Sequence, residues 1–258
     1  STSPEGVANL KQDGTEAHVF DGTAPSFAIR TALNRATHVL ISAPPDSAGD
    51  PVLRHYSRDL AETAGIKWIG YLSTIGVYGD HKGAWVDEAT PAHPRSQRSK
   101  RRLAAETSWL DFARRSGKRV QILRLAGIYG PGRSPIDNLR DGTARRIIKP
   151  GQVFNRIHVA DIASVLVAAM AGRGTEAIYN VTDDEPAPPQ DVVAFAARLL
   201  DVPPPPEMTL EAAGLSPMGL SFYAENKRVR NARLKADLGV TLMYPTYREG
   251  LRSLVASA

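Results

Sequence analysis

Two arginines set four residues apart are the first candidates for chemistry in this sequence. Arg98 and Arg102 stand in "RSKRRLAAE", and Glu106 continues the same spacing. On a helix the three side chains would share one face, where two guanidinium groups can together hold a phosphate or a carboxylate. An ion pair between Arg102 and Glu106, worth about 0.3–0.5 kcal/mol, would explain one arginine without a ligand. The stretch therefore predicts an anion site, with a solvated helix face as the alternative.

A hydroxyl and a phenol precede these arginines in "LSTIGVYG". Thr74 ends a predicted strand, where its hydroxyl can polarise a substrate or bond only to the neighbouring main chain. Tyr78 is a second candidate catalytic residue because a phenol can act as an acid. A tyrosine in this setting more often packs its ring and bonds its hydroxyl locally.

His158 and Asp161 in "NRIHVADIA" suggest an acid and a base. Asp161, however, falls in the first turn of an apolar helical segment, where a carboxylate interacts favourably with the helix dipole. We therefore expect these two residues to have a structural role.

Composition excludes several classes of site and partner. The 258 residues include no cysteine and six scattered histidines, so disulfides, thiolate chemistry and a metal site are not expected. The net charge of +5 permits attraction to phosphates, but "RSQRSKRR" is the one concentrated basic run and no aromatic residues interleave with it. We expect no nucleic-acid partner. No apolar run approaches the roughly 18 residues that would span a bilayer, and no signal pattern opens the chain, so we expect no membrane partner and a cytoplasmic protein.

Short apolar runs alternate with longer segments of helical periodicity, which is typical of a doubly wound parallel α/β sheet. The predicted strands are 17–20, 38–42, 67–73, 120–127 and 177–182, and the helices between them are 26–34, 52–63, 97–116 and 159–171. Beyond about residue 180, proline-rich runs bracket further helices at 191–200, 231–238 and 247–255. The predicted division is an α/β domain over 1–180 and a small helical cap over 181–258.

Five motifs occur along the chain, and their combination is more specific than any one of them alone: "LSTIGVYG", "DEATPAHP", "RLAGIYGPGR", "NRIHVADIA" and "IYNVTDDEP". In order and spacing they resemble the NAD-dependent epimerase/dehydratase family, the extended short-chain dehydrogenases/reductases, and the chain is most similar to an atypical branch of it. The resemblance runs from about Glu5 to Leu254. It implies a Rossmann-like fold with a C-terminal substrate-binding cap, NAD or NADP as cofactor, and a nucleotide-linked or otherwise anionic small molecule as substrate.

One departure concerns the cofactor. Members of this family open with a strand, a glycine-rich GxxGxxG turn and a helix whose amides hold the pyrophosphate. The first residues here resemble instead the segment after the second strand, as if the first strand, turn and helix were missing. We therefore expect this chain to bind NAD or NADP weakly.

The second departure concerns the proton relay. The resemblance implies a Ser or Thr at a strand end, which is Thr74, and a Tyr with a Lys four residues on, whose positions hold Arg98 and Arg102. An alternative register through Lys100 puts Ser96 at the Tyr position. Neither register supplies a phenol, so the resemblance implies that the relay is replaced by cations that position an anion.

The resemblance also implies the residues that would lie along the cofactor: Asp21 and Gly22 at the adenine, Ser42, Ala43 and Pro44 at the ribose, and Ala126, Gly127 and Ile128 at the nicotinamide. It implies substrate contacts from Arg133, in a loop with Pro131, and from Arg156. Asp21 before glycine is equally a turn residue, and glycine and proline are what any surface loop requires.

Together these features predict an NAD(P)-binding, epimerase/dehydratase-like protein that acts on or binds an anionic small molecule. The alternative is a non-catalytic binding or scaffold protein that kept the fold and lost both cofactor and chemistry. Relatives dimerise through the helices equivalent to 52–63 and 97–116, so a homodimer is expected. These helices carry a candidate apolar stripe of Leu53, Tyr56, Leu60, Leu103, Trp109, Leu110 and Phe112, which can equally face the sheet.

Overall fold

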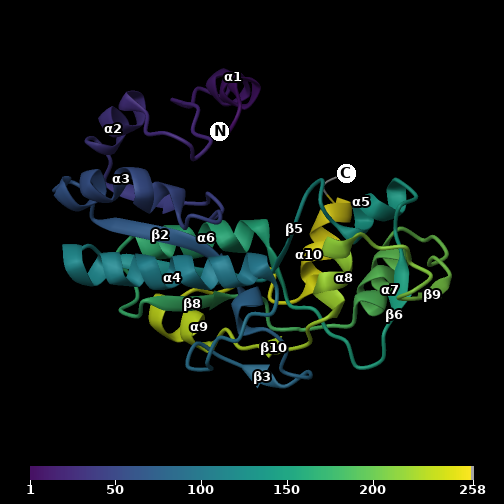
Figure 1. Ribbon diagram of the computed structural model, residues 1–258. Helices are drawn as coiled ribbons and strands as arrows, with labels where there is room; N and C mark the ends of the chain where they lie inside the picture. The colour runs from purple at the N-terminus through teal and green to yellow at the C-terminus, as the bar shows by residue number, and fades with distance from the viewer. Residues whose placement is uncertain (257–258) are drawn as a thin grey trace. The chain divides into compact units, whose positions relative to one another are not determined.

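The computed structural model describes residues 1–256 (Figure 1). These residues form two compact units, each described here by itself. Unit 1 comprises residues 1–72 and 100–122, and unit 2 comprises residues 73–99 and the chain from 123 onward. The predicted boundary at residue 180, between an α/β domain and a small helical cap, stays a prediction.

Unit 1 contains a parallel strand pair and its helices. β1 (His38–Ile41) pairs with β2 (Trp68–Thr74) in parallel, with His38 opposite Trp68, and β4 (Val120–Leu125) follows β2 in the strand order. The helices are α1 (Pro4–Gln12), α2 (Phe27–Leu33), α3 (Pro51–Glu62) and α4 (Gln97–Ser116), whose first residues belong to unit 2. Strand, helix and parallel strand in succession confirm the predicted α/β class.

Aromatic side chains make up much of the core of unit 1. The ring of Trp109 lies 5.9 Å from that of Tyr71 and 5.6 Å from that of Phe112. Tyr56 and Leu60 of α3 are also fully buried. Most of the apolar stripe that was a candidate for dimerisation is therefore used inside the unit, and Leu53, Leu103 and Leu110 are its partly exposed members. The dimer itself stays a prediction.

Unit 2 contains more elements. Its helices are the 3-10 helix η1 (Ile75–Tyr78), α5 (Pro135–Arg140), α6 (Val159–Met170), α7 (Pro189–Leu199), α8 (Pro217–Tyr223), α9 (Ala232–Leu238) and α10 (Tyr247–Ala256). Its strands are β3 (Trp85–Val86), β5 (Gly127–Tyr129), β6 (Arg146–Ile148), β7 (Arg156–His158), β8 (Ile178–Val181), β9 (Glu207–Thr209) and β10 (Arg228–Val229). β8 lies beside the end of β4, and the pairs β5–β7, β6–β9 and β3–β10 are parallel.

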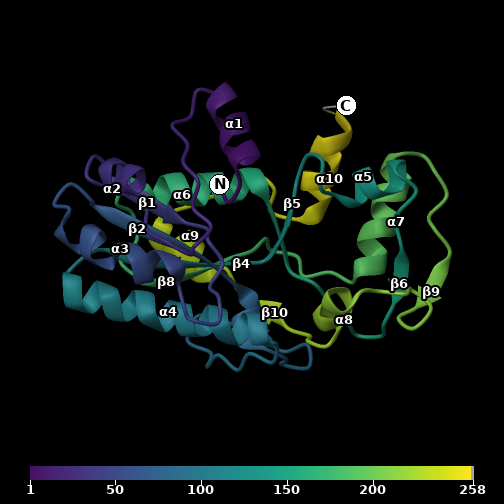
Figure 2. The same cartoon turned by 45° about the horizontal axis from the view of Figure 1, so that its top comes forward.

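Two clusters of apolar side chains hold unit 2 together. α7 packs against α5, α10 and β6, as Figure 1 shows, around Tyr129, Phe195 and Tyr247. A smaller cluster joins Ile147 to Tyr223 of α8. Elsewhere in the unit, α9 lies beside β8 and α6 (Figure 2).

The predicted strand at 17–20 is wrong. Its residues are irregular, with Phe20 N donating to Ser1 O at 2.8 Å, and the ring of Phe20 packs against Tyr56 at 5.4 Å. An apolar run can pack by its side chains without joining a ladder. α1, α5 and α8 were not predicted, because each is short and two of them contain fewer than eight residues. None of the helices in residues 1–256 is long and apolar enough to cross a bilayer.

Candidate functional site

Thr74 ends β2, and its hydroxyl oxygen accepts a hydrogen bond from Gly76 N at 3.1 Å, which caps η1. Gly76 is bordered by a second hydroxyl. A Cβ atom at Gly76 would lie 3.0 Å from Ser99 Oγ and 3.4 Å from Thr74 Oγ1. Thr74 at a strand end and Ser99 in the first turn of α4 therefore both face this glycine.

The start of α4 is fixed by serine hydroxyls. Ser96 Oγ accepts from Ser99 N at 3.1 Å and donates to Ser99 Oγ at 2.9 Å. Ser96, which the alternative register placed at the Tyr position, is thus engaged in holding the helix end. Arg98 follows in the first turn, and it is exposed.

Arg98 lies over an aromatic ring that the sequence analysis did not identify. Its guanidinium carbon is 5.4 Å from the ring centroid of Phe222 on α8, and Phe222 is 50% exposed. Within residues 1–256 no carboxylate pairs with Arg98. The guanidinium therefore keeps its charge and donors available for an anion. The contact joins residues far apart in the sequence, and no local pattern indicates it.

Arg102 belongs to unit 1 and has partners there. One of its guanidinium nitrogens donates to Tyr71 Oη at 2.9 Å and to Leu72 O at 3.0 Å. Burial raises the pKa of Tyr71 to about 12, and Arg102 opposes that rise. The phenol beside Arg102 thus keeps its proton at neutral pH and supplies no relay. These bonds favour a positioning role for Arg102 at the end of β2, and its part in an anion clamp stays a prediction.

Tyr78 is fully buried, and its hydroxyl donates to Asn180 Oδ1 at 2.8 Å. The Arg124 guanidinium lies 4.9 Å from its ring centroid. Burial raises the pKa of this phenol, which makes it a weaker acid. The structure therefore favours the packing alternative for Tyr78 over a catalytic one.

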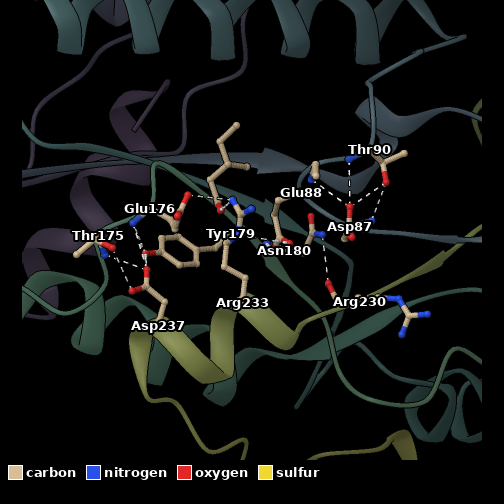
Figure 3. A network of polar contacts seen from close by, with 12 residues as sticks. Asp87, Glu88, Thr90, Thr175, Glu176, Tyr179, Asn180, Arg230, Arg233 and Asp237 are labelled. Atoms are coloured by element: carbon tan, nitrogen blue, oxygen red, sulfur yellow. Dashed lines mark hydrogen bonds and ion pairs between the residues drawn. The ribbon is translucent and has the colours of Figure 1, made fainter.

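Asn180 is part of a polar network around β8 and α9 (Figure 3). The main-chain N of Asn180 donates to Glu88 of the "DEATPAHP" motif at 2.8 Å, and its side-chain Nδ2 donates to Arg230 O at 3.2 Å. The hydroxyl of the preceding residue in β8, Tyr179, donates to Asp237 of α9. These motif residues hold unit 2 together.

The predicted adenine contacts lie in a turn of unit 1. Asp21 accepts from Thr23 N at 2.9 Å and from Thr23 Oγ1 at 2.7 Å, and these bonds lower the pKa of its carboxyl. Gly22 has φ +86° and is buried, and its carbonyl accepts from Arg54 at 2.9 Å. The turn role weighed for Asp21 is thus observed, and its contact with adenine stays a prediction.

The turn that follows β1 tests whether unit 1 can hold a pyrophosphate. Ser42, Ala43 and Pro44 leave β1, and α3 begins at residue 51. Asp50 Oδ1 accepts from the first free amides of α3, Val52 N at 2.9 Å and Leu53 N at 3.0 Å. A carboxylate already occupies the place where a helix would hold a phosphate, and it would repel one. In residues 1–256 no turn of the GxxGxxG spacing joins a strand to a helix, so the start of α3 does not fit a pyrophosphate.

The predicted nicotinamide contacts lie in unit 2. Ala126 N bonds to Val181 O at 3.0 Å, and Gly127 is the register partner of Arg156 between β5 and β7. Gly127 and Ile128 are exposed. A Cβ atom at Gly127 would lie 3.2 Å from Asn155 O, so a glycine keeps this main chain both close-packed and open. Contact of this segment with nicotinamide stays a prediction.

The two predicted substrate arginines differ. Arg133 is exposed in a tight turn, where its main chain exchanges bonds with Gly130 at 3.1 and 3.2 Å. Arg156 is partly buried, and its guanidinium donates to Phe154 O at 3.0 Å and Ala187 O at 3.2 Å. These bonds reinforce the bridge between Phe154 and Ala187. Substrate binding by either arginine stays a prediction.

His158 and Asp161 are buried structural residues, as expected. His158 Nδ1 accepts from Ala160 N at 3.2 Å, and burial lowers the pKa of its imidazole. The ring lies 5.1 Å from Tyr129 and 4.2 Å from Tyr244. His158 is therefore a neutral cap of α6.

A buried carboxyl that sequence reasoning missed stands just after β8. Asp183 is 1% exposed, and its Oδ2 has no hydrogen-bond partner. Burial raises the pKa of Asp183 well above its usual range, and the charge of Arg156 opposes this only in part. A carboxyl group whose pKa is higher in the folded protein than in the unfolded chain contributes stability at low pH. This contribution is fully present below the pKa of aspartate in the unfolded chain, about 3.9. That stability is lost as the pH rises through the folded-state pKa.

Asp183→Asn should remove this pH dependence. The free energy of unfolding of the wild type relative to the variant should fall as the pH rises from about 4 through neutrality, and the variant should equal or exceed the wild type by about 1 kcal/mol at the upper end. Urea unfolding across this range measures the difference, with Asp191→Asn, an exposed carboxyl, as control. A wild type that gains stability over the variant as the pH rises would contradict the prediction.

Comparison with known proteins places this site in a family. The model of the NAD dependent epimerase/dehydratase family matches residues 55–182, a stretch that contains Thr74, the start of α4, Gly127 and Arg156. The chain belongs to the NAD-dependent epimerase/dehydratase family. That Thr74 and Arg98 stand at the positions of the family's catalytic hydroxyl and relay tyrosine stays a prediction.

Individual relatives differ in what is known of them. A solved structure of a functionally unknown conserved protein from Silicibacter pomeroyi DSS is 50% identical, with a TM-score of 0.87 over 100% of this chain and 88% of that one. Protein YeeZ of Escherichia coli (strain K12) is 29% identical over 91% of this chain and 85% of its own length. The 3-diazoavenalumate denitrifying reductase of a Streptomyces species is 34% identical over 50% of this chain, and the match spans 45% of that reductase.

The fold also occurs in family members of low identity. The dTDP-glucose 4,6-dehydratase of Bacillus anthracis str. Ames, solved in complex with NAD, has a TM-score of 0.71 at 19% identity, over 98% of this chain and 83% of that one. This likeness confirms the predicted Rossmann-like fold.

Proposed function

We propose that this protein is an NAD(P)-dependent oxidoreductase of the epimerase/dehydratase family that acts on an anionic small molecule without a tyrosine relay. The observation that carries the proposal is that unit 2 holds both the Thr74 hydroxyl, at the end of β2, and the exposed guanidinium of Arg98, in the first turn of α4. A reaction at a polar group of an anionic substrate requires a hydrogen-bond donor at the reacting group and a cation that binds the negative charge, and the hydroxyl and the guanidinium supply these two.

Three parts of the chain have different roles in the proposed reaction. Thr74 Oγ1 accepts from Gly76 N, so its O–H can donate a hydrogen bond that polarises a substrate oxygen or nitrogen, while the proton that completes a reduction comes from solvent. Arg98 binds and orients the anionic group, because a guanidinium offers five N–H donors in a fixed fork and no acceptor. Residues Ala126, Gly127 and Ile128 would lie along the nicotinamide, which supplies or accepts a hydride when bound.

The relatives support reduction as the type of reaction. The Streptomyces relative is named a reductase, whereas the family description names epimerases and dehydratases. A reduction whose proton comes from solvent needs no phenol that alternates between acid and base. The replacement of the relay is consistent with such a reaction.

A second candidate is the non-catalytic binding protein. It is favoured by Asp50, whose carboxylate occupies the amides of α3, and by Arg102, which is engaged with Tyr71 and Leu72. A binding protein would retain the Arg98 site without turnover. The homodimer remains an additional prediction for either function.

Cofactor binding by residues 1–258 should be weak. Each hydrogen bond to a charged group is worth about 1.5–3 kcal/mol, and the described residues contain no GxxGxxG turn, whose amides hold the pyrophosphate in this family. Calorimetric titration with NADH and NADPH should give dissociation constants well above the low-micromolar range. A low-micromolar constant would contradict this prediction.

Turnover decides between the two functions. The assay follows the loss of nicotinamide absorbance at saturating NADH or NADPH, with a panel of aldehyde, ketone and diazo carboxylates and with nucleotide sugars. We expect turnover of at least one anionic substrate. If every substrate fails while anions still bind, the oxidoreductase is wrong and the binding protein is supported.

A further inference from the structure

One surface of unit 2 bears on the kind of anion that is bound. It consists of Arg98 and two side chains of α8, Met218 and Phe222, and we call it the Arg98–Phe222 surface. Met218 and Phe222 are 61% and 50% exposed. Met218 and Phe222 stand four residues apart and share one helix face, and Arg98 lies over the ring of Phe222 at 5.4 Å.

Exposure of large apolar side chains on so short a helix indicates a binding surface, because water contact with this area is unfavourable. The charge beside it is uncompensated, since no carboxylate in the described part of the chain pairs with Arg98. Lys149, a cation near the end of α8, is engaged with Tyr223 O and Gln152. The planar guanidinium of Arg98 thus lies beside the apolar face formed by Met218 and Phe222.

This combination selects among anions. Sugar hydroxyls require hydrogen-bond partners, and Met218 and Phe222 have none to give. A pyrophosphate carries more charge than one guanidinium neutralises. A carboxylate, in contrast, matches a guanidinium with two parallel bonds. A planar apolar body fits beside a guanidinium and an aromatic ring, because both accept stacked neighbours.

We infer that the ligand of the Arg98–Phe222 surface is a small carboxylate with a planar, largely apolar body, and not a sugar nucleotide. Arg98 binds its carboxylate, and Phe222 and Met218 contact its body. The inference rests on the proposed function for one point only, that this ligand is the substrate presented to Thr74.

The test is a calorimetric titration of the full chain, without nicotinamide, with 4-phenylbutyrate as probe. Arg98→Ala should weaken binding about 10-fold or more, and Phe222→Ala should weaken it roughly 5-fold. The neutral 4-phenylbutyramide should bind about 10-fold more weakly than the acid and be indifferent to Arg98→Ala. Arg98→Lys, which keeps the charge without the fork, should lie between the wild type and the alanine variant.

Arg230→Ala is the matched control. Arg230 also lies over an exposed aromatic ring of unit 2, that of Trp85 at 4.9 Å, but it is outside the proposed surface. This variant should bind the probe as the wild type does, and all variants should melt near the wild-type temperature because the replaced side chains are exposed.

Three results would overturn the inference: no binding of 4-phenylbutyrate at millimolar concentration, binding indifferent to both Arg98→Ala and Phe222→Ala, or UDP-glucose alone showing the dependence on Arg98. Because the titration contains no cofactor, its outcome is separate from that of the turnover assay. Binding without turnover refutes the proposed function alone, and turnover without this binding refutes the inference alone.

Discussion

Thr74→Val should lower kcat/KM for the reduced substrate by roughly 10²- to 10³-fold. The substitution keeps the shape of the side chain and removes the hydroxyl whose proton is available to the substrate, since Thr74 Oγ1 already accepts from Gly76 N. Thr74→Ser should recover most of the activity because it restores the donor. Steady-state kinetics of the three proteins with a substrate found by the turnover screen measures the effect.

A structural role alone would give a different pattern. The bond from Gly76 N to Thr74 caps a short 3-10 helix, and its loss costs about 0.5–1.5 kcal/mol of stability. Thr107→Val, at an exposed threonine of α4 that donates to Leu103 O, is the control and should be fully active. If Thr74→Val retains wild-type kinetics, Thr74 has no catalytic role, and equal loss in the serine variant, which keeps both the cap and the donor, points to the missing methyl group instead of the hydroxyl.

The elements that were predictable are those with long, regular apolar patterns. α4 has the predicted bounds, and β2 and α6 differ from prediction by a residue or so at their ends. The failures are local patterns with too few residues to decide. The apolar run at 17–20 packs beside Tyr56 instead of pairing, and α8, which carries Phe222, contains only seven residues.

The candidate site was predictable only in its polar positions. Thr74 and Arg98 follow from motif spacing, because a strand end and a helix turn have fixed geometry. The partners that decide their roles come from distant segments. Phe222 beneath Arg98 belongs to α8, and Asn180, which engages Tyr78, belongs to β8. Motif spacing gives no information on such contacts, so Tyr78 was retained as a candidate acid although its hydroxyl is bonded.

Asp161→Ala should destabilise unit 2 by about 3 kcal/mol, the largest stability effect we expect from one substitution. The Asp161 side chain is fully buried, and its two oxygens accept from Met243 N at 2.6 Å and Tyr244 N at 3.1 Å. Hydrogen bonds to a charged group contribute about 1.5–3 kcal/mol each, and the carboxylate also stands in the first turn of α6. Asp161→Asn keeps one acceptor and should cost about half as much.

Asp191→Ala separates the bonds of Asp161 from its place in a helix. Asp191 also stands in a first turn, that of α7, but it is exposed, and its replacement should change stability by less than about 0.5 kcal/mol. Urea unfolding gives the energies, and amide hydrogen exchange at Met243 and Tyr244 locates the change. Both amides should exchange faster in Asp161→Ala, because each loses its acceptor. A stable Asp161→Ala variant with unchanged exchange would show that these two bonds do not hold the segment before α10 in place.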